Sequence, residues 1–343
     1  MTVTVRSFAK INLGLCIGGL RPDGFHELHT VYQTIGLHDV IRVTIGRGSA
    51  IQIRCNDPGV PQNDSNTCYR MAERALEALK VEARVLIEIE KQLPVQGGLG
   101  GASGNAVAVL FALERGLKKQ IPGPEKLRIA AEVGSDLPLF LVGGTVLGLG
   151  RGEQVYPLAD LPPMACVVAQ PPIGVSTPKA FAGWDLMLSG QRDAAATGSA
   201  SSSPKLTLRN PSDRMLKFSR RVSAWLSGLP EGEGKLGRPK SGVPARGRGR
   251  AESPLLDLVR TGIENDFEQV VFPQYPELRE VKCLLERGGA VYASLSGSGA
   301  AVFGLFASRA GAEKGAAKLE QSGVPFQITT TLTRRQYWKR IYD

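Results

Sequence analysis

The stretch Pro94-Val-Gln-Gly-Gly-Leu-Gly-Gly-Ala-Ser-Gly-Asn105 decides the interpretation of this chain. It joins a strand-like segment to an apolar helical run over residues 106–113. A chain keeps so bare a backbone where another group must approach it closely. The free N–H groups and the positive dipole end of a helix N-terminus favour an anion there, above all a phosphate. The sequence therefore predicts a phosphate-binding loop at the start of a helix.

The glycine loop by itself also allows less specific interpretations. It lacks the Gly-Lys-[Ser/Thr] of Walker-type loops, and Ser103 stands where a dinucleotide-binding fingerprint needs glycine. A flexible connection, or tight packing of a helix on a sheet, would explain the glycines equally well. Ser103 favours a functional role, because a hydroxyl at a helix start can cap the helix or face a phosphate or Mg²⁺.

Length and composition indicate a globular protein. The chain has 343 residues, of which 42% are hydrophobic, so it is long enough for two domains with real cores. Five scattered cysteines without a CxxC pair favour a reducing cytosol over a disulfide scaffold or a zinc site. The first residues are too polar for a signal peptide, and no run approaches the roughly 18 apolar residues of a membrane span. We therefore expect a soluble, cytoplasmic protein without a membrane partner.

The net charge of +10 is concentrated in one segment. Residues 190–253 contain 13 Lys and Arg against 5 Asp and Glu, so the rest of the chain carries only +2. The segment includes Ala/Ser-rich and Gly/Arg-rich pieces that cannot bury enough apolar surface to fold. We expect a disordered, basic surface insertion, interrupted by an amphipathic helix over residues 213–226. The side chains expected on or near the apolar face of this helix are Met215, Leu216, Val222 and Trp225.

The hydrophobic periodicity of the remaining chain predicts both strands and helices. Alternating or short apolar runs predict strands at residues 2–7, 11–17, 40–45, 51–54, 83–89, 145–149, 165–169, 290–295, 301–306 and 325–331. Helical spacing predicts helices at residues 66–79, 125–133, 276–287 and 310–321. Asp64 or Ser65 is the expected N-cap of the first of these helices.

Two isolated charged residues lie in or beside apolar stretches. Lys10 stands within residues 8–13, either as a solvated edge residue, which is the more usual case, or as a partly buried cation with a partner. Asp136 precedes the apolar run at residues 137–142, and N-capping of a short helix is its simplest role. Neither residue by itself indicates catalysis.

Two further loops are candidates for ligand contacts. Leu295-Ser-Gly-Ser-Gly-Ala300 lies between two predicted strands, where a hairpin turn would explain it. Its bare backbone and two hydroxyls could also close over the far side of the phosphate ligand. Phe25 and His26 follow the turn at residues 22–24, and such a pair can stack on and hydrogen-bond a base, although ordinary packing is the commoner role.

Six stretches of the chain form one ordered pattern, which covers about residues 1–185 and 255–332. They are Ala9-Lys-Ile-Asn-Leu13, Arg21-Pro-Asp-Gly-Phe-His-Glu-Leu28 with Thr30 and Leu37-His-Asp39, residues 94–104, Gly134-Ser-Asp-Leu-Pro-Leu-Phe140, Asn265-Asp-Phe-Glu268 and Leu295-Ser-Gly-Ser-Gly299. Together they resemble the GHMP kinase superfamily, which includes galactokinase, homoserine kinase and mevalonate kinase. Within it they are most similar to the kinases that act on 4-diphosphocytidyl-2-C-methyl-D-erythritol in the non-mevalonate isoprenoid pathway.

The resemblance implies a two-domain α+β fold of the GHMP kinase type. The N-terminal ATP-binding domain would span residues 1–160 and be similar to the second domain of ribosomal protein S5. The C-terminal domain would span residues 161–343, with a ferredoxin-like βαβ arrangement and the insertion at about 190–253. The active site would lie in the cleft between the two domains.

The resemblance also implies a reaction, the ATP-dependent phosphorylation of the 2-hydroxyl of 4-diphosphocytidyl-2-C-methyl-D-erythritol with Mg²⁺. Asp136 would orient or deprotonate that hydroxyl. Lys10 would keep Asp136 ionised and stabilise the developing charge. Phe25 and His26 would bind the cytosine, and Asn12 would touch the polar end of the substrate.

The same resemblance assigns the glycine loop to ATP, with Ser103 as a ligand of phosphate or Mg²⁺. The loop departs from the family pattern at Gln96 and Ala102, where a small residue and a glycine are usual, and at Gly104, where a serine is usual. Because backbone amides do most of the phosphate binding, we expect weaker but retained ATP binding. The residues expected to hold ATP are Pro94, Val95, Gln96, Gly97, Gly98, Leu99, Gly100, Gly101, Ala102, Ser103 and Gly104.

The alternative function is that of a nucleic-acid-binding or scaffold protein acting through residues 190–253, since basic Gly-Arg tracts bind RNA phosphates. That segment has one Trp, one Phe and no Tyr, which disfavours a nucleic-acid partner. A related kinase with another small alcohol substrate is a third possibility, which Phe25 and His26 disfavour. We expect ATP and the cytidyl compound as small-molecule partners, and a monomer or homodimer.

Overall fold

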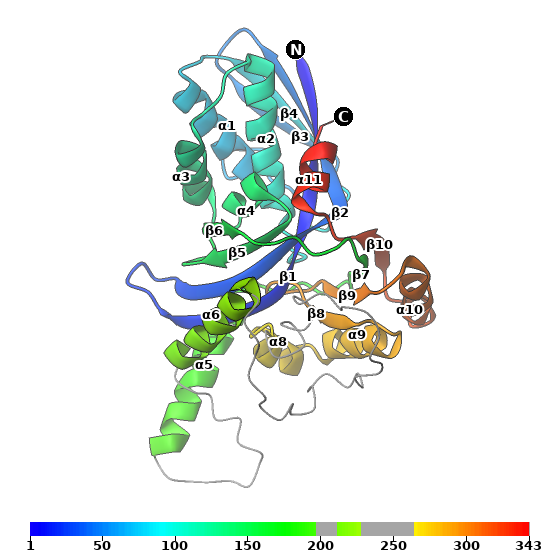
Figure 1. Ribbon diagram of the computed structural model, residues 1–343. Helices are drawn as coiled ribbons and strands as arrows, with labels where there is room; N and C mark the ends of the chain where they lie inside the picture. The colour runs from blue at the N-terminus through cyan, green and yellow to red at the C-terminus, as the bar shows by residue number, and fades with distance from the viewer. Residues whose placement is uncertain (197–210, 228–263, 343) are drawn as a thin grey trace. The chain divides into compact units, whose positions relative to one another are not determined.

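The computed structural model describes residues 1–196, 211–227 and 264–342, which belong to two compact units (Figure 1). Unit 1 contains Met1–Ile11, Thr30–Met164 and Thr329–Asp343, and unit 2 contains Asn12–His29 and Ala165–Ile328. The division after Met164 lies close to the boundary expected after residue 160. Two segments do not follow a simple division into N-terminal and C-terminal halves. Asn12–His29 of the N-terminal hairpin belongs to unit 2, and Thr329–Asp343 at the C-terminus belongs to unit 1. Periodicity does not reveal this exchange, because it reports burial and not the identity of the packing partner.

Unit 1 is built on a six-stranded sheet with the order β3-β4-β2-β5-β6, in which β1 also pairs with β2. Its strands are β1 (Thr2–Leu20), β2 (His26–Gly46), β3 (Ile51–Cys55), β4 (Arg84–Glu90), β5 (Thr145–Leu149) and β6 (Gln154–Pro157). β3 runs parallel to β4, whereas β4 and β5 are antiparallel to β2. The strands predicted at residues 2–7 and 11–17 are one continuous strand, because the intervening Lys10 is buried within it.

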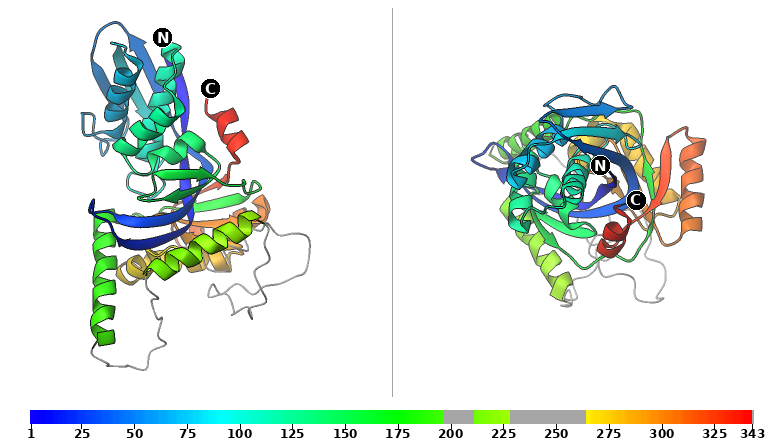
Figure 2. Two further views of the ribbon diagram at one scale, coloured as in Figure 1. Left: turned by 60° about the vertical axis from the view of Figure 1, so that its left-hand side comes forward. Right: turned by 90° about the horizontal axis from the view of Figure 1, so that it is seen from above.

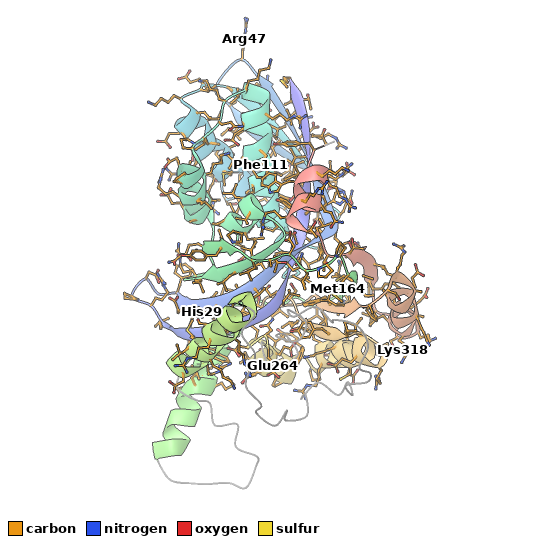
Figure 3. All side chains as sticks on the ribbon, in the orientation of Figure 1. His29, Arg47, Phe111, Met164, Glu264 and Lys318 are labelled. Carbon is orange, nitrogen blue, oxygen red and sulfur yellow. The ribbon has the colours of Figure 1, made fainter. Side chains whose placement is uncertain are left out.

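Helices α1, α2, α3 and α4 pack together on the sheet of unit 1 (Figures 1 and 2). The helices of this unit are α1 (Thr67–Leu79), α2 (Gly101–Leu117), α3 (Gly123–Val133), α4 (Leu137–Val142) and α11 (Arg334–Arg340). Phe111 of α2 belongs to their shared core, whereas Arg47, in the turn after β2, points away from it (Figure 3). Among the described helices, none is both long and apolar enough to span a membrane.

The predicted cap of α1 is wrong by one or two residues. The side chain of Asn66 accepts a hydrogen bond from the backbone N–H of Cys68 at 2.8 Å, so Asn66 is the N-cap instead of Asp64 or Ser65. The three residues are all good capping types, and only the backbone conformation distinguishes them. The helix predicted at residues 125–133 is confirmed as α3.

Unit 2 contains a four-stranded sheet with the order β10-β7-β9-β8, against which α9 and α10 pack (Figures 1 and 2). Its strands are β7 (Ala165–Ala169), β8 (Tyr292–Leu295), β9 (Val302–Phe306) and β10 (Phe326–Thr330). Its helices are α5 (Thr177–Ala196), α6 (Pro211–Ser227), α8 (Glu268–Gln274), α9 (Pro276–Arg287) and α10 (Arg309–Gln321). The four strands predicted after residue 160 and the helices predicted at residues 276–287 and 310–321 are confirmed.

The expected basic insertion at residues 190–253 is only partly described. The helix predicted at residues 213–226 is confirmed as α6, and the Gly/Arg-rich piece lies outside the described residues. The predicted apolar face is wrong in one respect, because Leu216 is 48% exposed whereas Met215 and Val222 are buried together with Phe218. Positions 215, 218 and 222 follow helical spacing, and position 216 is turned about 100° away from them. The side chain of Trp225 also lies outside the described set.

Candidate active site

The loop at residues 94–104 links β4 to α2 within unit 1 and curls through three left-handed residues. The backbone φ is 60° at Gln96, 72° at Gly98 and 71° at Gly100. Left-handed residues at alternate positions turn neighbouring N–H groups toward one side, which creates a concave anion site. Gln96 adopts this conformation without being a glycine, which costs about 1–2 kcal/mol. Its side chain is exposed.

Helix α2 begins at Gly101, directly behind this concave loop. Its N-cap is Gly100, no side chain caps it and its first turn contains no acidic residue. The capping role considered for Ser103 is therefore wrong, because the helix starts two residues before it. The other role considered for Ser103 remains open, since this residue lines the adjoining pocket.

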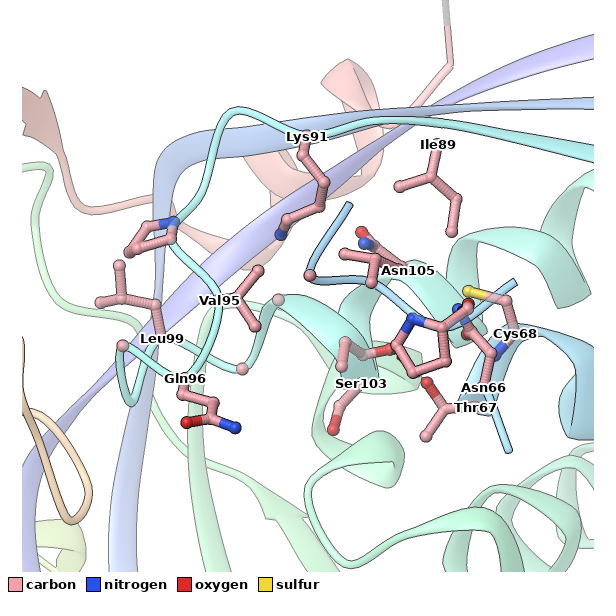
Figure 4. Close-up of a pocket in the computed structure, with 18 of the residues that line it drawn as sticks. Asn66, Thr67, Cys68, Ile89, Lys91, Val95, Gln96, Leu99, Ser103 and Asn105 are labelled. Carbon is pink, nitrogen blue, oxygen red and sulfur yellow. Dashed lines mark hydrogen bonds between the residues drawn. The ribbon is translucent and has the colours of Figure 1, made fainter. Parts of the chain in front are cut away.

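A pocket of about 340 Å³ adjoins the loop and lies entirely within unit 1 (Figure 4). Its apolar wall includes Val60, Ile89 and Leu99, and its polar side chains include Lys91 and Asn105. The volume lies within the range of small-molecule sites. Asn105 lines the pocket, and its Oδ1 is buried without a hydrogen-bond partner among the described residues. An apolar slot that opens onto a concave row of amides fits a nucleotide.

Lys10 and Asp136 come together beside this loop. The Lys10 ammonium Nζ lies 3.6 Å from Asp136 Oδ2, and the lysine side chain is 4% exposed against 34% for the aspartate. Burial lowers the pKa of Lys10, and the Asp136 carboxylate opposes that shift. Lys10 is therefore the buried cation with a partner that the sequence allowed, and the solvated interpretation is wrong. Asp136 precedes α4 but makes no side-chain cap, so its carboxylate faces Lys10 instead of its own helix.

Tyr32 of β2 is a third member of this group, which the sequence analysis missed. Its hydroxyl donates a hydrogen bond of 3.0 Å to Asp136 Oδ1, and Lys10 Nζ lies 5.8 Å from the centre of its ring. The ring is buried. No sequence signal distinguishes Tyr32, because a tyrosine is a common residue in the buried strands of a protein core.

A direct backbone contact connects the charged pair to the glycine loop. The Lys10 N–H donates to the Leu99 carbonyl at 2.9 Å. A Cβ on Gly100 would lie 3.0 Å from Lys10 Cγ and 2.9 Å from Phe140 Cζ. Gly100 is therefore needed both for its left-handed backbone and for the close approach of the lysine stem.

Asp39 is a second residue without an assigned role in the sequence analysis. This buried carboxylate accepts hydrogen bonds from the backbone of Gln92 and Leu93 at 2.8 Å each, from Lys91 Nζ at 2.6 Å and from Asn105 Nδ2 at 2.9 Å. Its partners are the segment that enters the glycine loop and the helix that leaves it. Asp39 therefore holds both ends of the loop, which explains why it belongs to the quoted pattern.

The departure at Gly104 does not face the pocket. A Cβ on Gly104 would lie 2.8 Å from Ser7 Oγ and 3.1 Å from the Phe8 carbonyl, and Gly104 does not line the pocket. Ala102, another departure, is exposed and accepts a hydrogen bond from the Thr67 hydroxyl at 3.0 Å through its carbonyl. Neither departure places a side chain in the path of a phosphate at Gly98 or Gly100.

The expected substrate residues lie in the part of the chain that belongs to unit 2. Phe25 is 51% exposed, whereas Asn12 and His26 are buried. His26 stacks on Phe181 with ring centroids 4.9 Å apart, and its Nε2 lies 2.8 Å from Asp185 Oδ1. The structure thus surrounds His26 with partners that the sequence analysis missed, because α5 carries them far along the chain.

The Ser-Gly-Ser-Gly loop connects the antiparallel strands β8 and β9, so the hairpin interpretation is correct. Asn265 donates to the carbonyls of Leu295 and Gly297 at 2.9 and 2.7 Å. Glu268 accepts from the Leu295 N–H at 2.9 Å. The Asn265-Asp-Phe-Glu268 stretch therefore holds the β8 side of this loop. Whether the loop meets the phosphate ligand stays a prediction.

Within the described ranges, no group of three or more His, Cys, Asp or Glu side chains could hold a metal ion. Ser103, which lines the pocket beside the glycine loop, offers a side-chain oxygen that could contact Mg²⁺. That donor set fits an ion whose remaining ligands are phosphate oxygens and water.

Comparison with known families identifies both halves of the chain. Residues 66–144 match the family described as the GHMP kinases N terminal domain, and residues 252–324 match the GHMP kinases C terminal family. The first match contains α1, the glycine loop and Asp136. The predicted GHMP-kinase-like α+β fold is confirmed.

Several curated relatives are similar over nearly their full length. The 4-diphosphocytidyl-2-C-methyl-D-erythritol kinase of Solibacter usitatus is 34% identical over 89% of this chain and 81% of its own. The kinase of the same name from Desulfitobacterium hafniense is 34% identical over 97% of both chains. Family membership follows from this identity and coverage.

Solved structures agree with that relationship. A crystal structure of 4-(cytidine 5'-diphospho)-2C-methyl-D-erythritol kinase has a TM-score of 0.65 at 28% identity, with 96% of this chain and 98% of that chain covered. The homoserine kinase of Cytophaga hutchinsonii, at 18% identity and a TM-score of 0.64 over 97% of this chain and 95% of that one, shares the fold. With a glycine loop that suits a phosphate, a buried lysine paired with a half-buried aspartate, and these relatives, the chain belongs to the 4-diphosphocytidyl-2-C-methyl-D-erythritol kinase family of the GHMP kinases.

Proposed function

We propose that this chain transfers the γ-phosphoryl group of ATP to the 2-hydroxyl of 4-diphosphocytidyl-2-C-methyl-D-erythritol. The observation that carries the proposal is the double role of Lys10. Its backbone N–H binds the glycine loop at Leu99, and its ammonium lies 3.6 Å from Asp136. An acidic group is thereby held beside a concave row of amides, which is the arrangement that phosphoryl transfer to an alcohol requires.

ATP would occupy the pocket beside α2, with its phosphates over the amides of residues 96–101. The left-handed φ values of Gln96, Gly98 and Gly100 and the uncapped start of α2 support this orientation. When bound, Mg²⁺ neutralises charge on the β- and γ-phosphate oxygens. The Ser103 hydroxyl is the side chain of this loop that we assign to it.

Asp136 would act on the acceptor hydroxyl. As the O–P bond forms, the hydroxyl proton passes to the carboxylate, the bond to the β,γ-bridging oxygen breaks, and ADP leaves. Lys10 would keep the carboxylate ionised in this half-buried position and offset the charge that develops on the transferred group. Phosphoryl transfer needs little covalent work from the protein, so position and charge suffice.

The cytidyl end of the substrate would bind the residues of unit 2. The exposed ring of Phe25 is available for stacking on a base, and the Asp185 contact at Nε2 orients the His26 imidazole for a polar edge. Asn12 would contact the polar end of the same substrate. The cytoplasmic location and the monomeric or homodimeric state expected from the sequence stay predictions, and light scattering would test the latter.

A comparison of three acceptors tests this function. Purified chain is mixed with ATP, Mg²⁺ and either the cytidyl substrate, homoserine or mevalonate, and ADP release is followed with a coupled assay. We expect turnover with the cytidyl compound that exceeds the other two by at least about a hundredfold, since a polar site rejects ligands that leave it unpaired. Equal turnover of all three, or turnover of homoserine alone, would contradict the assigned substrate.

A further inference from the structure

The two oxygens of the Asp136 carboxylate have different partners. Oδ1 accepts the hydrogen bond from the Tyr32 hydroxyl at 3.0 Å, and Oδ2 faces Lys10 Nζ at 3.6 Å. A carboxylate can rotate about its terminal bond, because that torsion has a broad energy profile. Asp136 makes no capping bond to α4, so its own helix does not fix it. A separate group must therefore set the rotation.

We propose that Tyr32 is the positioning residue of Asp136, holding Oδ1 so that Oδ2 is presented to Lys10 and to the acceptor hydroxyl. This inference rests on the proposed kinase function. It goes beyond it by assigning to a buried core tyrosine the orientation of the group that receives the proton.

The surroundings of Tyr32 allow it little movement. Its ring is 2% exposed, and Tyr32 pairs with Val146 across the β2–β5 ladder. A Cβ on Gly152 would overlap the Tyr32 hydroxyl, and one on Gly148 would lie 2.5 Å from Cε2 of its ring. Gly148 of β5 and Gly152 of the turn that follows it thus make the space that the phenol fills. The hydroxyl cannot leave Asp136 without displacing this turn.

The charges around the pair keep the phenol a donor. Burial and the adjacent Asp136 carboxylate raise the pKa of Tyr32 well above its usual value, so it stays protonated. Lys10 faces both its ring and Asp136 from β1. Glu153, in the turn after β5, also raises the pKa of Tyr32 through its charge. Arg151 forms an ion pair with Glu153 at 3.8 Å. A hydrogen bond donated to a carboxylate favours its charged form, and the protonated phenol stays available to donate to Asp136 Oδ1.

Loss of the phenol oxygen has a specific expected effect. In Tyr32→Phe, Asp136 keeps Lys10 as its charged neighbour. It loses the hydrogen bond to Oδ1 that fixes the rotation of the carboxylate. Proton acceptance then becomes poorly aligned, whereas the ATP loop keeps its contacts. We expect kcat to fall about tenfold, which corresponds to one neutral-to-charged hydrogen bond, with an unchanged KM for ATP. In a plot of kcat/KM against pH, the acid limb should move to higher pH.

Tyr337→Phe is the matched control. Tyr337 is equally buried in unit 1, and its hydroxyl donates to the Phe140 carbonyl at 2.7 Å, without contact to Asp136. Both variants lose one buried phenol oxygen and should lose similar thermal stability. Only Tyr32→Phe should shift the acid limb. An unshifted limb with wild-type kcat in Tyr32→Phe, or equal shifts in both variants, would overturn the proposal.

A second variant keeps the test decisive if Tyr32→Phe fails to fold. Site-specific 3-fluorotyrosine at position 32 retains the hydroxyl and makes it a stronger donor, so the acid limb should move to lower pH. An acid limb at its wild-type position in this protein would also refute the inference. If the wild-type chain shows no turnover of the cytidyl substrate, the proposed function fails, which is a result distinct from either of these.

Discussion

The backbone N–H of Lys10 donates to the carbonyl of Leu99 at 2.9 Å, so the residue that faces the candidate base also holds the phosphate loop. A movement of β1 by even 1 Å would disturb both features together. In the proposed reaction this contact would link the position of the γ-phosphate to the position of the acceptor oxygen. Phosphoryl transfer depends on such alignment, because its rate rests on positioning more than on covalent chemistry.

Asp136→Asn should abolish most turnover and leave the protein folded. The amide has nearly the same shape but cannot accept the hydroxyl proton, and general-base removal costs about 10²–10⁴-fold in kcat. Because the carboxylate opposes the lowering of the Lys10 pKa by burial, that pKa should fall further in the variant. Lys10 can then lose its proton instead of unfolding the core. ADP release and circular dichroism measure the two effects, and near-normal turnover would remove Asp136 from its role.

Gly100→Ala should weaken both the fold and ATP binding. A left-handed alanine and its overlap with Phe140 and Lys10 together cost about 2–4 kcal/mol. The KM for ATP should rise more than kcat falls, because the amide row is distorted. Gly123→Ala is the control, since a Cβ at Gly123 meets nothing within 4 Å. Denaturant unfolding and ATP titration provide the readouts, and equal behaviour of the two variants would contradict the close approach at Gly100.

Asp39→Asn should loosen both ends of the ATP loop. The change leaves the Lys91 ammonium, 6% exposed, without its carboxylate partner. Removal of one partner of a buried ion pair costs about 3–5 kcal/mol. The KM for ATP should rise in parallel, since the amide nitrogen that replaces Oδ2 cannot accept the hydrogen bond from Asn105 on the helix that leaves the glycine loop.

The double variant Asp39→Asn/Lys91→Met separates the cost of an unpaired Lys91 ammonium from the cost of the lost contacts at the glycine loop. It removes the stranded ammonium, so it should recover part of the stability but not the ATP affinity. Glu90→Gln, at the exposed pair with Arg42, should change neither quantity. Chemical denaturation of the wild-type chain and of the three variants measures their free energies of unfolding. A double variant less stable than Asp39→Asn would show that Lys91 is not the source of the loss.

Phe25→Ala should raise the KM for the cytidyl substrate by about 5- to 100-fold with little change in kcat, as expected for the loss of one stacked base. The ring is 51% exposed, so its removal should not destabilise unit 2. Leu20→Ala, which removes another exposed side chain of the same hairpin, is the control. Steady-state kinetics with saturating ATP measures both, and an unchanged KM in Phe25→Ala would exclude it from the base site.

Most of the fold could be predicted from periodicity and turn chemistry. Strands such as β5 and β7 and helices such as α3 and α9 follow directly from their apolar spacing. The exchange of Asn12–His29 into unit 2 could not be predicted, because one continuous strand gives no local sign of a change of partner. The N-cap of α1 could not be predicted for a similar reason, since Asp64, Ser65 and Asn66 are all good capping residues.

The candidate site was only partly visible in the sequence. Lys10, Asp136 and the glycine loop are unusual residues in their surroundings, and a family pattern brings them together. Tyr32 and Asp39 lie in a strand, and their spacing along the chain gives no sign of a functional role. Only the hydrogen bonds that they make in the folded chain indicate those roles. Phe181 and Asp185 are separated from His26 by most of unit 1 along the chain, so no spacing rule could connect them.

A double-mutant cycle on Lys10 and Asp136 is the most direct measurement of the central idea, that the two side chains act as one unit in phosphoryl transfer. Lys10→Met, Asp136→Asn and the double variant are compared with the wild-type chain for ADP release with the cytidyl substrate at saturating ATP. The predicted result is a double variant that loses no more activity than Asp136→Asn alone, as residues acting together are strongly non-additive. Losses that multiply would show that the two groups contribute independently, and would contradict the pairing.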